Sequence, residues 1–470
     1  MDLPLSFIRS MNLLFGADEF EDFQKALSAE APVSIRLNKG KPFIFSDGGW
    51  KQVPWCPTGY YLPIRPSFTF DPLFHAGVYY VQEASSMFLS QVVRTYLKEP
   101  VVALDVCAAP GGKSTLLQDN LTDGSLLIAN EVIPQRAQIL KENLIKWGCP
   151  STIVSQNETS TFSHLNHFFD FILADVPCSG EGMFRKDEVA IKEWNLDNVE
   201  ACWKRQRMIV ENVWPSLKPG GILVYSTCTY NTLEDEQNVK WIQKTLGADF
   251  LEVPIHSDWM ITSALGGEKI PVYRFFPHKT KGEGLFMAVL RKTSGEELKS
   301  SQWRKKEKEK SKSKSKSKSN ISVSIPNICK EWIQNSNDYQ FQWFKDRIIA
   351  IPTFHVEQWS ILSQYLNILH AGVTIGCTKG KDIIPDHCLA MSQVASDSFP
   401  KEEVSYNQAI SFLRKESISL NSETPRGFVL LTYNSLPLGF VKNVGNRANN
   451  LYPQEWRIRS GFFPEKVITL

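Results

Sequence analysis

The sequence predicts an α/β protein with a mainly parallel central sheet and a smaller β-rich module near its end. From Val101 to about Lys292, short apolar runs alternate with helix-forming segments, which is the order of strands and helices in a parallel sheet. Polar side chains follow several of these runs, at the edge where open α/β sheets bind ligands. Later, Gly427–Tyr433 and Leu438–Asn443 flank a turn at 434–437 and predict a hairpin.

Length and composition exclude several classes of protein. The 470 residues suit about two to four domains, and 42% hydrophobic content is ordinary for a globular chain. A net charge of only +2 means that any contact with nucleic acid depends on local charge. No apolar run is as long as a membrane span, and residues 1–6 lack the basic start of a secretory signal. The nine cysteines are scattered without a CxxC pair, so we expect no metal, no disulfide framework and a cytoplasmic location.

A glycine-rich turn in the first strand–helix unit is the most informative stretch. Val101–Asp105 predicts a buried strand, Ala108–Gly112 is a turn of small residues, and Ser114–Leu121 can form a helix. Glycines let the backbone approach a ligand closely, so the stretch predicts a cradle for a nucleotide-like ligand. Cys107 occupies the place of the first glycine of a P-loop, which disfavours ATP. A tight turn without a ligand is the alternative.

The later elements of this region follow in the same alternating order. Glu131 follows the second expected strand, Asn157 the third and Asp175 the fourth. A carboxylate at Glu131 suits the hydroxyls of a ribose, although an acid at a strand end is often only a helix cap. We expect strands at 125–130, 151–155, 168–174 and 221–225, helices at 134–147, 196–217 and 233–246, and an antiparallel hairpin within 271–291.

The segments outside the α/β region are less informative. Arg36 and the aromatic residues of 55–74 could contact RNA, but a packed lid on the next domain is an equal alternative. Residues 304–319 are dominated by lysine and serine, so they predict an extended linker, with attraction to phosphate as a second role. We expect Ile325–Leu470 to fold separately. Its last part, 446–459, mixes cations, amides and aromatics as RNA-contacting surfaces do, and a structural arginine cluster is the alternative.

Two cysteines follow strands of the predicted sheet. Cys178 comes after the fourth strand and Cys228 after the fifth. A buried cysteine is usually a small hydrophobic residue, so either one alone would be interpreted as structural. Both, however, are expected at the edge that faces the glycine-rich turn, and this shared placement makes them candidate catalytic residues.

The ordered motifs Asp105–Lys113, Asp175–Gly180 and Ser226–Thr229 resemble those of the NOL/NOP/Sun family of RNA cytosine-C5 methyltransferases. Gly180–Lys186 and the tail 438–457 look like the bacterial RsmF/YebU branch, which acts on 16S rRNA in the decoding region. The resemblance implies a Rossmann-like S-adenosylmethionine-dependent methyltransferase core, an N-terminal RNA-binding region and a C-terminal PUA-like module. The domains that we expect are 1–97, the N-terminal region; 98–293, the methyltransferase; 294–323, the linker; 324–402, an interdomain segment; and 403–470, the PUA-like module.

The same resemblance assigns roles to individual residues. Cys228 would be the nucleophile, Cys178 would help to release the product, and Asp175 would face the cytosine. Independently of the resemblance, Lys113 could assist electrostatically, and the alternative is that it only fixes the turn. Asn157 stands where the family often has an aspartate near the adenine, and this change loses a charge. The cofactor, S-adenosyl-L-methionine, would be held by Cys107, Ala108, Ala109, Pro110, Gly111, Gly112, Lys113, Glu131, Arg136, Asn157 and Asp175.

Cytosine chemistry explains why cysteines are needed. Addition of a thiolate at C6 makes C5 nucleophilic enough to take a methyl group, so we expect the surroundings of Cys228 to lower its pKa. The expected partner is 16S rRNA, free or in the small ribosomal subunit, with no membrane and a monomeric state. The alternatives are a tRNA substrate, a non-catalytic ribosome-assembly factor and a DNA cytosine methyltransferase. The DNA enzymes use the Pro-Cys cysteine and have no need of Cys228.

Overall fold

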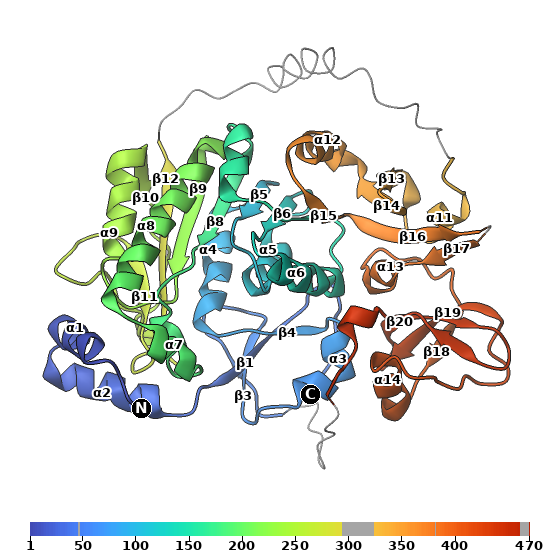
Figure 1. Ribbon diagram of the computed structural model, residues 1–470, viewed down its shortest axis with the longest axis horizontal. Helices are drawn as coiled ribbons and strands as arrows, with labels where there is room; N and C mark the ends of the chain where they lie inside the picture. The colour runs from blue at the N-terminus through green and yellow to red at the C-terminus, as the bar shows by residue number, and fades with distance from the viewer. Residues whose placement is uncertain (46–47, 294–323, 381, 461–469) are drawn as a thin grey trace.

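The computed structural model describes residues 1–45, 48–293, 324–380, 382–460 and 470. The predicted linker, 294–323, lies outside the described residues. Figure 1 shows a central sheet with helices on its two faces, two C-terminal sheets to one side and a pair of N-terminal helices near the other end. Within the described part of the chain, no helix is long and apolar enough to span a membrane.

The N-terminal region contains a helical hairpin followed by a small antiparallel sheet with the strand order β2-β3-β1-β4. Arg36 lies in this sheet, and its side chain is fully buried, paired with Asp119 and bonded to Thr115. Arg36 therefore packs the sheet onto the next domain and is not available to RNA. The elements are α1 (Leu5–Phe15), α2 (Ala17–Ser28), β1 (Val33–Leu37), β2 (Lys51–Gln52), β3 (Gly59–Leu62), α3 (Pro72–His75), β4 (Tyr79–Val81) and α4 (Leu89–Tyr96).

The central sheet has the strand order β10-β12-β9-β8-β5-β6-β7-β15, with β11 paired to β12. The strands β9, β8, β5, β6 and β7 are parallel, and the flanking strands are antiparallel. Its strands are β5 (Val102–Asp105), β6 (Leu126–Asn130), β7 (Thr152–Ser155), β8 (Phe169–Asp175), β9 (Leu217–Thr227), β10 (Ala248–Phe250), β11 (Val272–Phe275), β12 (Leu285–Lys292) and β15 (Ile368–Ala371). Its helices are α5 (Gly112–Asn120), α6 (Pro134–Trp147), α7 (Glu188–Glu193), α8 (Leu196–Val213) and α9 (Glu236–Trp241).

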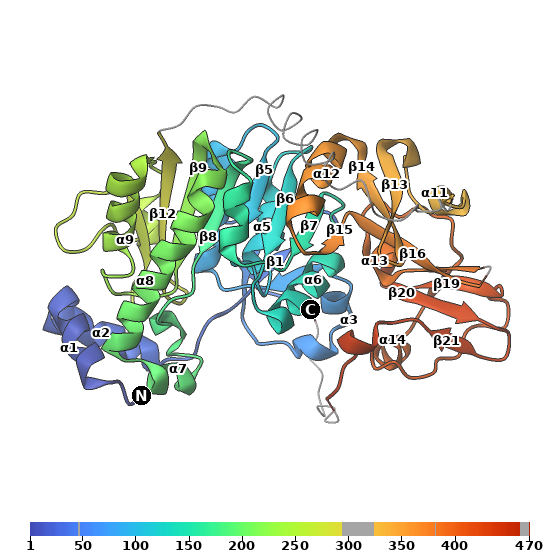
Figure 2. The same cartoon turned by 45° about the horizontal axis from the view of Figure 1, so that its top comes forward.

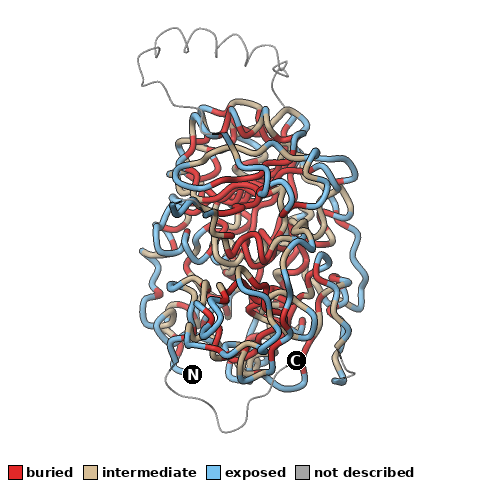
Figure 3. The backbone as a smooth tube through the Cα atoms, turned by 90° about the vertical axis from the view of Figure 1, so that its right-hand side faces the viewer, coloured by how far each residue is buried: buried red, intermediate tan, exposed pale blue. Residues whose placement is uncertain are grey.

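Both faces of this sheet are covered, which explains why its strands are nearly continuous apolar runs. Alternate residues go to two clusters: Leu104 and Ile172 pack with α8, whereas Ala103 and Phe171 pack with α4 and α5. Figure 3 shows the buried backbone concentrated in the middle of the molecule. The predicted parallel strands and the hairpin within 271–291 are confirmed. The helix expected at 233–246 instead begins at Glu236 and ends in a π-helical turn, Ile242–Gly247.

Residues 324–402 form a four-stranded antiparallel sheet, with the strand order β13-β14-β16-β17, and they also add a strand to the central sheet. This strand, β15, pairs with β7, the last of the parallel strands. Leu366, two residues before β15, packs in the core of the central sheet. The structure differs here from the expectation that Ile325–Leu470 folds separately. The other elements are α11 (Ile328–Glu331), β13 (Tyr339–Phe344), β14 (Arg347–Pro352), α12 (Val356–Tyr365), β16 (Val373–Lys379), β17 (Asp382–Pro385) and α13 (His387–Met391).

The last part of the chain is the expected β-rich module. Its sheet has the order β18-β19-β20-β21 and comprises β18 (Lys401–Glu403), β19 (Gly427–Tyr433), β20 (Leu436–Asn443) and β21 (Ala448–Asn450), with α14 (Tyr406–Leu413). The predicted hairpin is confirmed, but its turn is only Asn434-Ser435, both with positive φ as in a type I′ turn. The module shares a core with the N-terminal region, where Phe70 and Leu73 pack with Phe412 and Tyr452. Figure 2 shows the module beside α3.

Candidate active site

The glycine-rich turn joins β5 to α5 at the carboxyl edge of the sheet. Gly111 has a φ of +115° immediately before the helix, a conformation that favours glycine. The Ser114 hydroxyl donates to Asp105 Oδ2 at 2.6 Å, while Asp105 Oδ1 is buried and has no hydrogen-bond partner among the described residues. Burial raises the pKa of Asp105 to about 7. The turn thus leaves a buried oxygen able to accept a hydrogen bond from a ligand.

The end of β6 offers a second buried acceptor, Glu131, beside the glycine-rich turn. Glu131 is buried; its Oε1 accepts from the amide of Ile133 at 3.0 Å, and Arg136 lies 3.5 Å from its other oxygen. Arg136 also donates to the carbonyl of Ala109 at 2.9 Å, so it ties α6 to the glycine-rich turn. Val132 and Ile133 are 40% and 42% exposed, which leaves an apolar surface beside a carboxylate. Such a surface suits a nucleoside, and the sequence alone did not indicate these two residues.

Asn157 follows β7, and both its backbone and its side chain are hydrogen-bonded to other segments of the chain. Its amide N–H donates to Asn130 Oδ1 at 3.0 Å, and its own Oδ1 accepts from the amide of Asn367 at 3.0 Å. Its side-chain nitrogen, Nδ2, is buried without a partner among the described residues. This edge of the sheet therefore offers acceptors at Asp105 and Glu131, an apolar surface at Val132–Ile133 and a donor at Asn157. Such a set of groups fits an adenosine-containing cofactor.

Asp175, at the end of β8, connects the turn to β9. Lys113 Nζ lies 2.8 Å from Asp175 Oδ2, and the Ser226 hydroxyl donates to Asp175 Oδ1 at 2.7 Å. Burial alone would lower the pKa of Lys113, but the Asp175 carboxylate more than offsets this, so the pKa is raised. Cys228 also acts to raise the pKa of Lys113.

The sulfur atoms of Cys178 and Cys228 lie 3.1 Å apart, although the two residues are 50 positions apart in the chain. Both are half-buried free thiols. The neighbouring Cys228 and burial raise the pKa of Cys178 well above its ordinary value. Cys178 therefore keeps its proton in the pair. The sequence-predicted residues Asp175, Lys113, Cys178 and Cys228 thus meet at one edge of the sheet, after β8 and β9.

Two buried glutamates that sequence reasoning missed join the loops carrying these cysteines. Glu181 accepts from Thr229 Oγ1 at 2.6 Å, from the amide of Tyr230 at 2.7 Å and from Trp194 Nε1 at 3.0 Å. Glu234 accepts from the amide of Ser179 at 3.0 Å. The only hint in the sequence was that acids interrupt the loops at Gly180-Glu-Gly182 and 234–236.

The backbones of the two loops also touch directly. The amide of Gly182 donates to the carbonyl of Cys228 at 2.7 Å, and a Cβ at Gly182 would lie only 2.7 Å from that oxygen. Any larger residue at this position would push the loops apart. The separation of the two sulfurs therefore depends on this glycine and on the two buried glutamates.

Comparison with known proteins matches three parts of the chain to one kind of enzyme. Residues 95–291 match the family described as 16S rRNA methyltransferase RsmB/F, and residues 3–84 match the N-terminal domain of 16S rRNA methyltransferase RsmF. Residues 399–458 match the PUA domain of methyltransferase RsmF. The chain belongs to the RsmF family of 16S rRNA methyltransferases. The resemblance drawn from the motifs and the predicted fold class are thereby confirmed.

Relatives in the RsmF family extend along nearly the whole chain. The ribosomal RNA small subunit methyltransferase F of Shewanella frigidimarina is 27% identical over 90% of this chain and 91% of its own length. The protein of the same name from Escherichia coli K12 is also 27% identical, over 93% of this chain and 92% of its own. A solved structure described as a methyltransferase homolog from Pyrococcus horikoshii is 28% identical, with a TM-score of 0.53 over 61% of this chain and 94% of that one.

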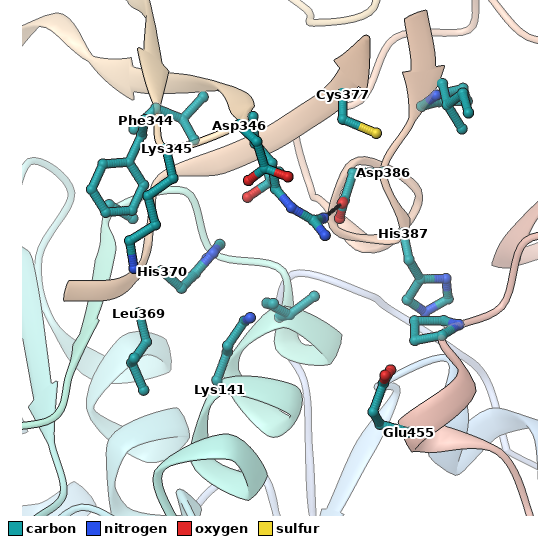
Figure 4. Close-up of a pocket in the computed structure, with 18 of the residues that line it drawn as sticks. Lys141, Phe344, Lys345, Asp346, Leu369, His370, Cys377, Asp386, His387 and Glu455 are labelled. Atoms are coloured by element: carbon teal, nitrogen blue, oxygen red, sulfur yellow. Dashed lines mark hydrogen bonds and ion pairs between the residues drawn. The ribbon is translucent and has the colours of Figure 1, made fainter. Parts of the chain in front are cut away.

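A further cavity of this RsmF-family chain, of about 550 Å³, is lined in part by Leu369, His370 and Ala371 of β15. It lies between α6, the turn from β13 to β14, β15, α13 and the segment 451–456 (Figure 4). None of the sequence-predicted site residues lines it. Its cations Lys141, Lys345 and Arg347 are matched by the acids Asp346, Asp386 and Glu455, so its charge selects no ligand.

Proposed function

We propose that this protein transfers a methyl group from S-adenosylmethionine to C5 of a cytosine in 16S rRNA, in the decoding region, through a covalent bond between Cys228 and C6. The single observation that carries the proposal is the 3.1 Å approach of Cys178 to Cys228 in an RsmF-family chain. A lone cysteine has many structural uses, but two converging thiols beside a carboxylate and a lysine suit addition to a pyrimidine and its reversal.

The cofactor would be held along the carboxyl edge of the sheet. Residues Cys107–Lys113 would hold its methionine part beside the buried Asp105, Glu131 would bind the ribose with Arg136 next to it, and Asn157 would contact the adenine. When bound, S-adenosylmethionine supplies an electrophilic methyl group. Burial raises the pKa of Cys107, so this thiol stays neutral and does not compete as a nucleophile.

The chain's own residues would perform the remaining chemistry. Cys228 adds to C6 of the cytosine, which places electron density on C5 and makes it nucleophilic. Asp175 hydrogen-bonds the amino edge or N3 of the base. Lys113, whose Nζ lies 2.8 Å from Asp175 Oδ2, stabilises negative charge in this part of the site electrostatically. After transfer, the C5 proton passes to a water molecule, the C5–H electron pair re-forms the C5=C6 double bond, and Cys228 leaves as a thiolate, with Cys178 assisting release. The base must be single-stranded or flipped out of its stack to reach this pocket.

Methylation of rRNA by purified protein and its variants tests this function. Bisulfite sequencing of 16S rRNA from a strain lacking the gene, incubated with wild-type protein and S-adenosylmethionine, should show a new 5-methylcytosine. Cys228→Ala should lose this signal while retaining cofactor binding, and Cys377→Ala, a half-buried thiol on β16, should retain both. Methylation of tRNA alone would contradict the rRNA assignment, and full activity of Cys228→Ala would contradict the covalent mechanism.

We also propose that the protein is monomeric and cytoplasmic, which sedimentation and cell fractionation test.

A further inference from the structure

The part of the chain after residue 323 reaches the candidate cofactor site. β15 pairs antiparallel with β7, so Ile368 lies opposite Ser155 and Ala371 opposite Ile153. Leu369 packs in one cluster with Ala108 and Ala109 of the glycine-rich turn and with Leu140 of α6. A residue of this later segment therefore shares a packed apolar cluster with two residues of the turn that would hold the methionine part of the cofactor.

Asn367, the residue before β15, is bonded to the strand end that carries Asn157. The amide of Gln156 donates to the Asn367 carbonyl at 3.0 Å, and the amide of Asn367 donates to Asn157 Oδ1 at 3.0 Å. The backbone of Asn157 is held at the same time by Asn130, which accepts from its amide and donates to its carbonyl at 3.0 Å each. These bonds leave the Asn157 side chain one orientation, because its oxygen is already engaged.

This orientation decides which group Asn157 offers to a ligand. Its Nδ2 is buried and has no partner among the described residues, and an amide nitrogen can only donate. A buried donor without a partner costs free energy, so it marks a place where a ligand acceptor fits. The adenine ring nitrogens accept hydrogen bonds, whereas its exocyclic amino group donates. Val132 and Ile133, which follow Glu131 in the chain, offer an exposed apolar surface on which such a ring could lie.

We propose that residues 366–371 form one wall of the cofactor site, and that the Asn367 amide orients Asn157 so that Nδ2 donates to a ring nitrogen of the adenine. The inference rests on the proposed function, since it concerns the same cofactor. It adds that the C-terminal half of the chain is part of the cofactor site as well as of the β-rich module. Asn367 is a positioning residue, and Asn157 is the residue that would contact the adenine.

Binding of S-adenosylhomocysteine, measured by calorimetry on the full chain without RNA, tests both parts. Asn157→Asp keeps the acceptor for the Asn367 amide but replaces the donor by a second acceptor, so affinity should fall at least about tenfold, the loss expected for one buried hydrogen bond. Affinity equal to that of the wild type, or tighter, would mean that the adenine amino group faces this residue, and would overturn the assignment of Nδ2.

A matched pair of variants tests Asn367. Asn367→Pro removes its N–H at a position preceded by Leu366, whose ψ of 144° accommodates proline, and should weaken binding about tenfold. Asn367→Ala keeps the N–H and loses only the long 3.4 Å contact to Gln156, so its affinity should match that of the wild type. Equal affinity of Asn367→Pro and Asn367→Ala would overturn the positioning role.

Hydrogen exchange on the wild-type protein covers the case in which Asn367→Pro does not fold. Saturation with S-adenosylhomocysteine should slow amide exchange at residues 366–371. Exchange in β17, which belongs to the sheet β13-β14-β16-β17, should stay unchanged. Unchanged exchange at 366–371 in the saturated protein would contradict the proposed wall. A wild-type protein that does not bind S-adenosylhomocysteine at all would instead refute the proposed function, so the two failures are distinguishable.

Discussion

Replacing Glu181 by glutamine should loosen the two loops that carry the cysteines. Glu181 is fully buried, and its two oxygens accept from five donors that belong to Thr229, Tyr230, Asn231 and Trp194. Four of these donors are N–H groups that can only donate, two at each oxygen, so the new amide NH₂ would face two N–H groups whichever way it turns. The Trp194 indole can only donate, and it would lose its acceptor if the NH₂ took the place of Oε1.

The magnitude follows from the bonds that are lost. Two buried donors without acceptors cost about 1–3 kcal/mol each, and the remaining bonds lose the strengthening of a charged acceptor. Removing a buried charge recovers part of this, so we expect a loss of about 4 kcal/mol in the free energy of unfolding. Urea unfolding followed by tryptophan fluorescence measures the loss, and methyl transfer should fall because Cys178 and Cys228 separate.

The matched control is Glu188→Gln, an exposed substitution in the first turn of α7, which should leave both quantities unchanged. A midpoint for Glu181→Gln that corresponds to less than about 1 kcal/mol of destabilisation would refute the argument, because the five donors would then have found other acceptors. Normal stability together with lost activity would equally contradict it, since the two effects are predicted to share one cause.

Three further results are expected. Arg274 is buried, donates to Glu236 at 2.7 Å and pairs with Asp235 at 3.1 Å, so Arg274→Met should destabilise the protein by about 3–5 kcal/mol in the same urea assay, and a loss below about 1 kcal/mol would contradict this. Burial raises the pKa of Asp105 from 3.8 to about 7, so the folded protein holds this proton more tightly than the unfolded one. Its stabilising contribution is complete below about pH 4 and is lost as the pH rises through about 7; Asp105→Asn should flatten this slope in the cofactor-free protein, and an unchanged slope would contradict it. Asp175→Asn leaves Lys113 without its ion-pair partner, so it should lower kcat about 100-fold or more with little effect on cofactor affinity, and a wild-type kcat would remove Asp175 from the chemistry.

The sequence was sufficient for the central sheet because its strands are short apolar runs that end in polar residues. That pattern located the ends of β5, β6, β7, β8 and β9, and hence the edge where the predicted residues meet. It could not give β15, because pairing with β7 joins residues far apart in the chain and leaves no local periodicity.

The supporting residues of the site were also beyond sequence reasoning. Glu181 lies between two glycines, a setting typical of an exposed loop, and only the folded chain places it under Trp194 and the Thr229 loop. Arg36 is the opposite case, in which the sequence allowed a functional role that the structure excludes. Its charge allowed contact with RNA, but its guanidinium is fully buried against Asp119. Burial of a charged residue depends on a partner that the local sequence does not contain.

The most direct test of the covalent mechanism is to identify which sulfur holds the RNA. A Cys178→Ala variant incubated with 16S rRNA and S-adenosylmethionine should accumulate a denaturation-resistant adduct. Mass spectrometry of its peptides should then locate the bound nucleotide on Cys228. A Cys228→Ala variant that forms the adduct on Cys178 instead would reverse the roles of the two thiols. The absence of an adduct from both variants, with methyl transfer intact, would refute the covalent mechanism.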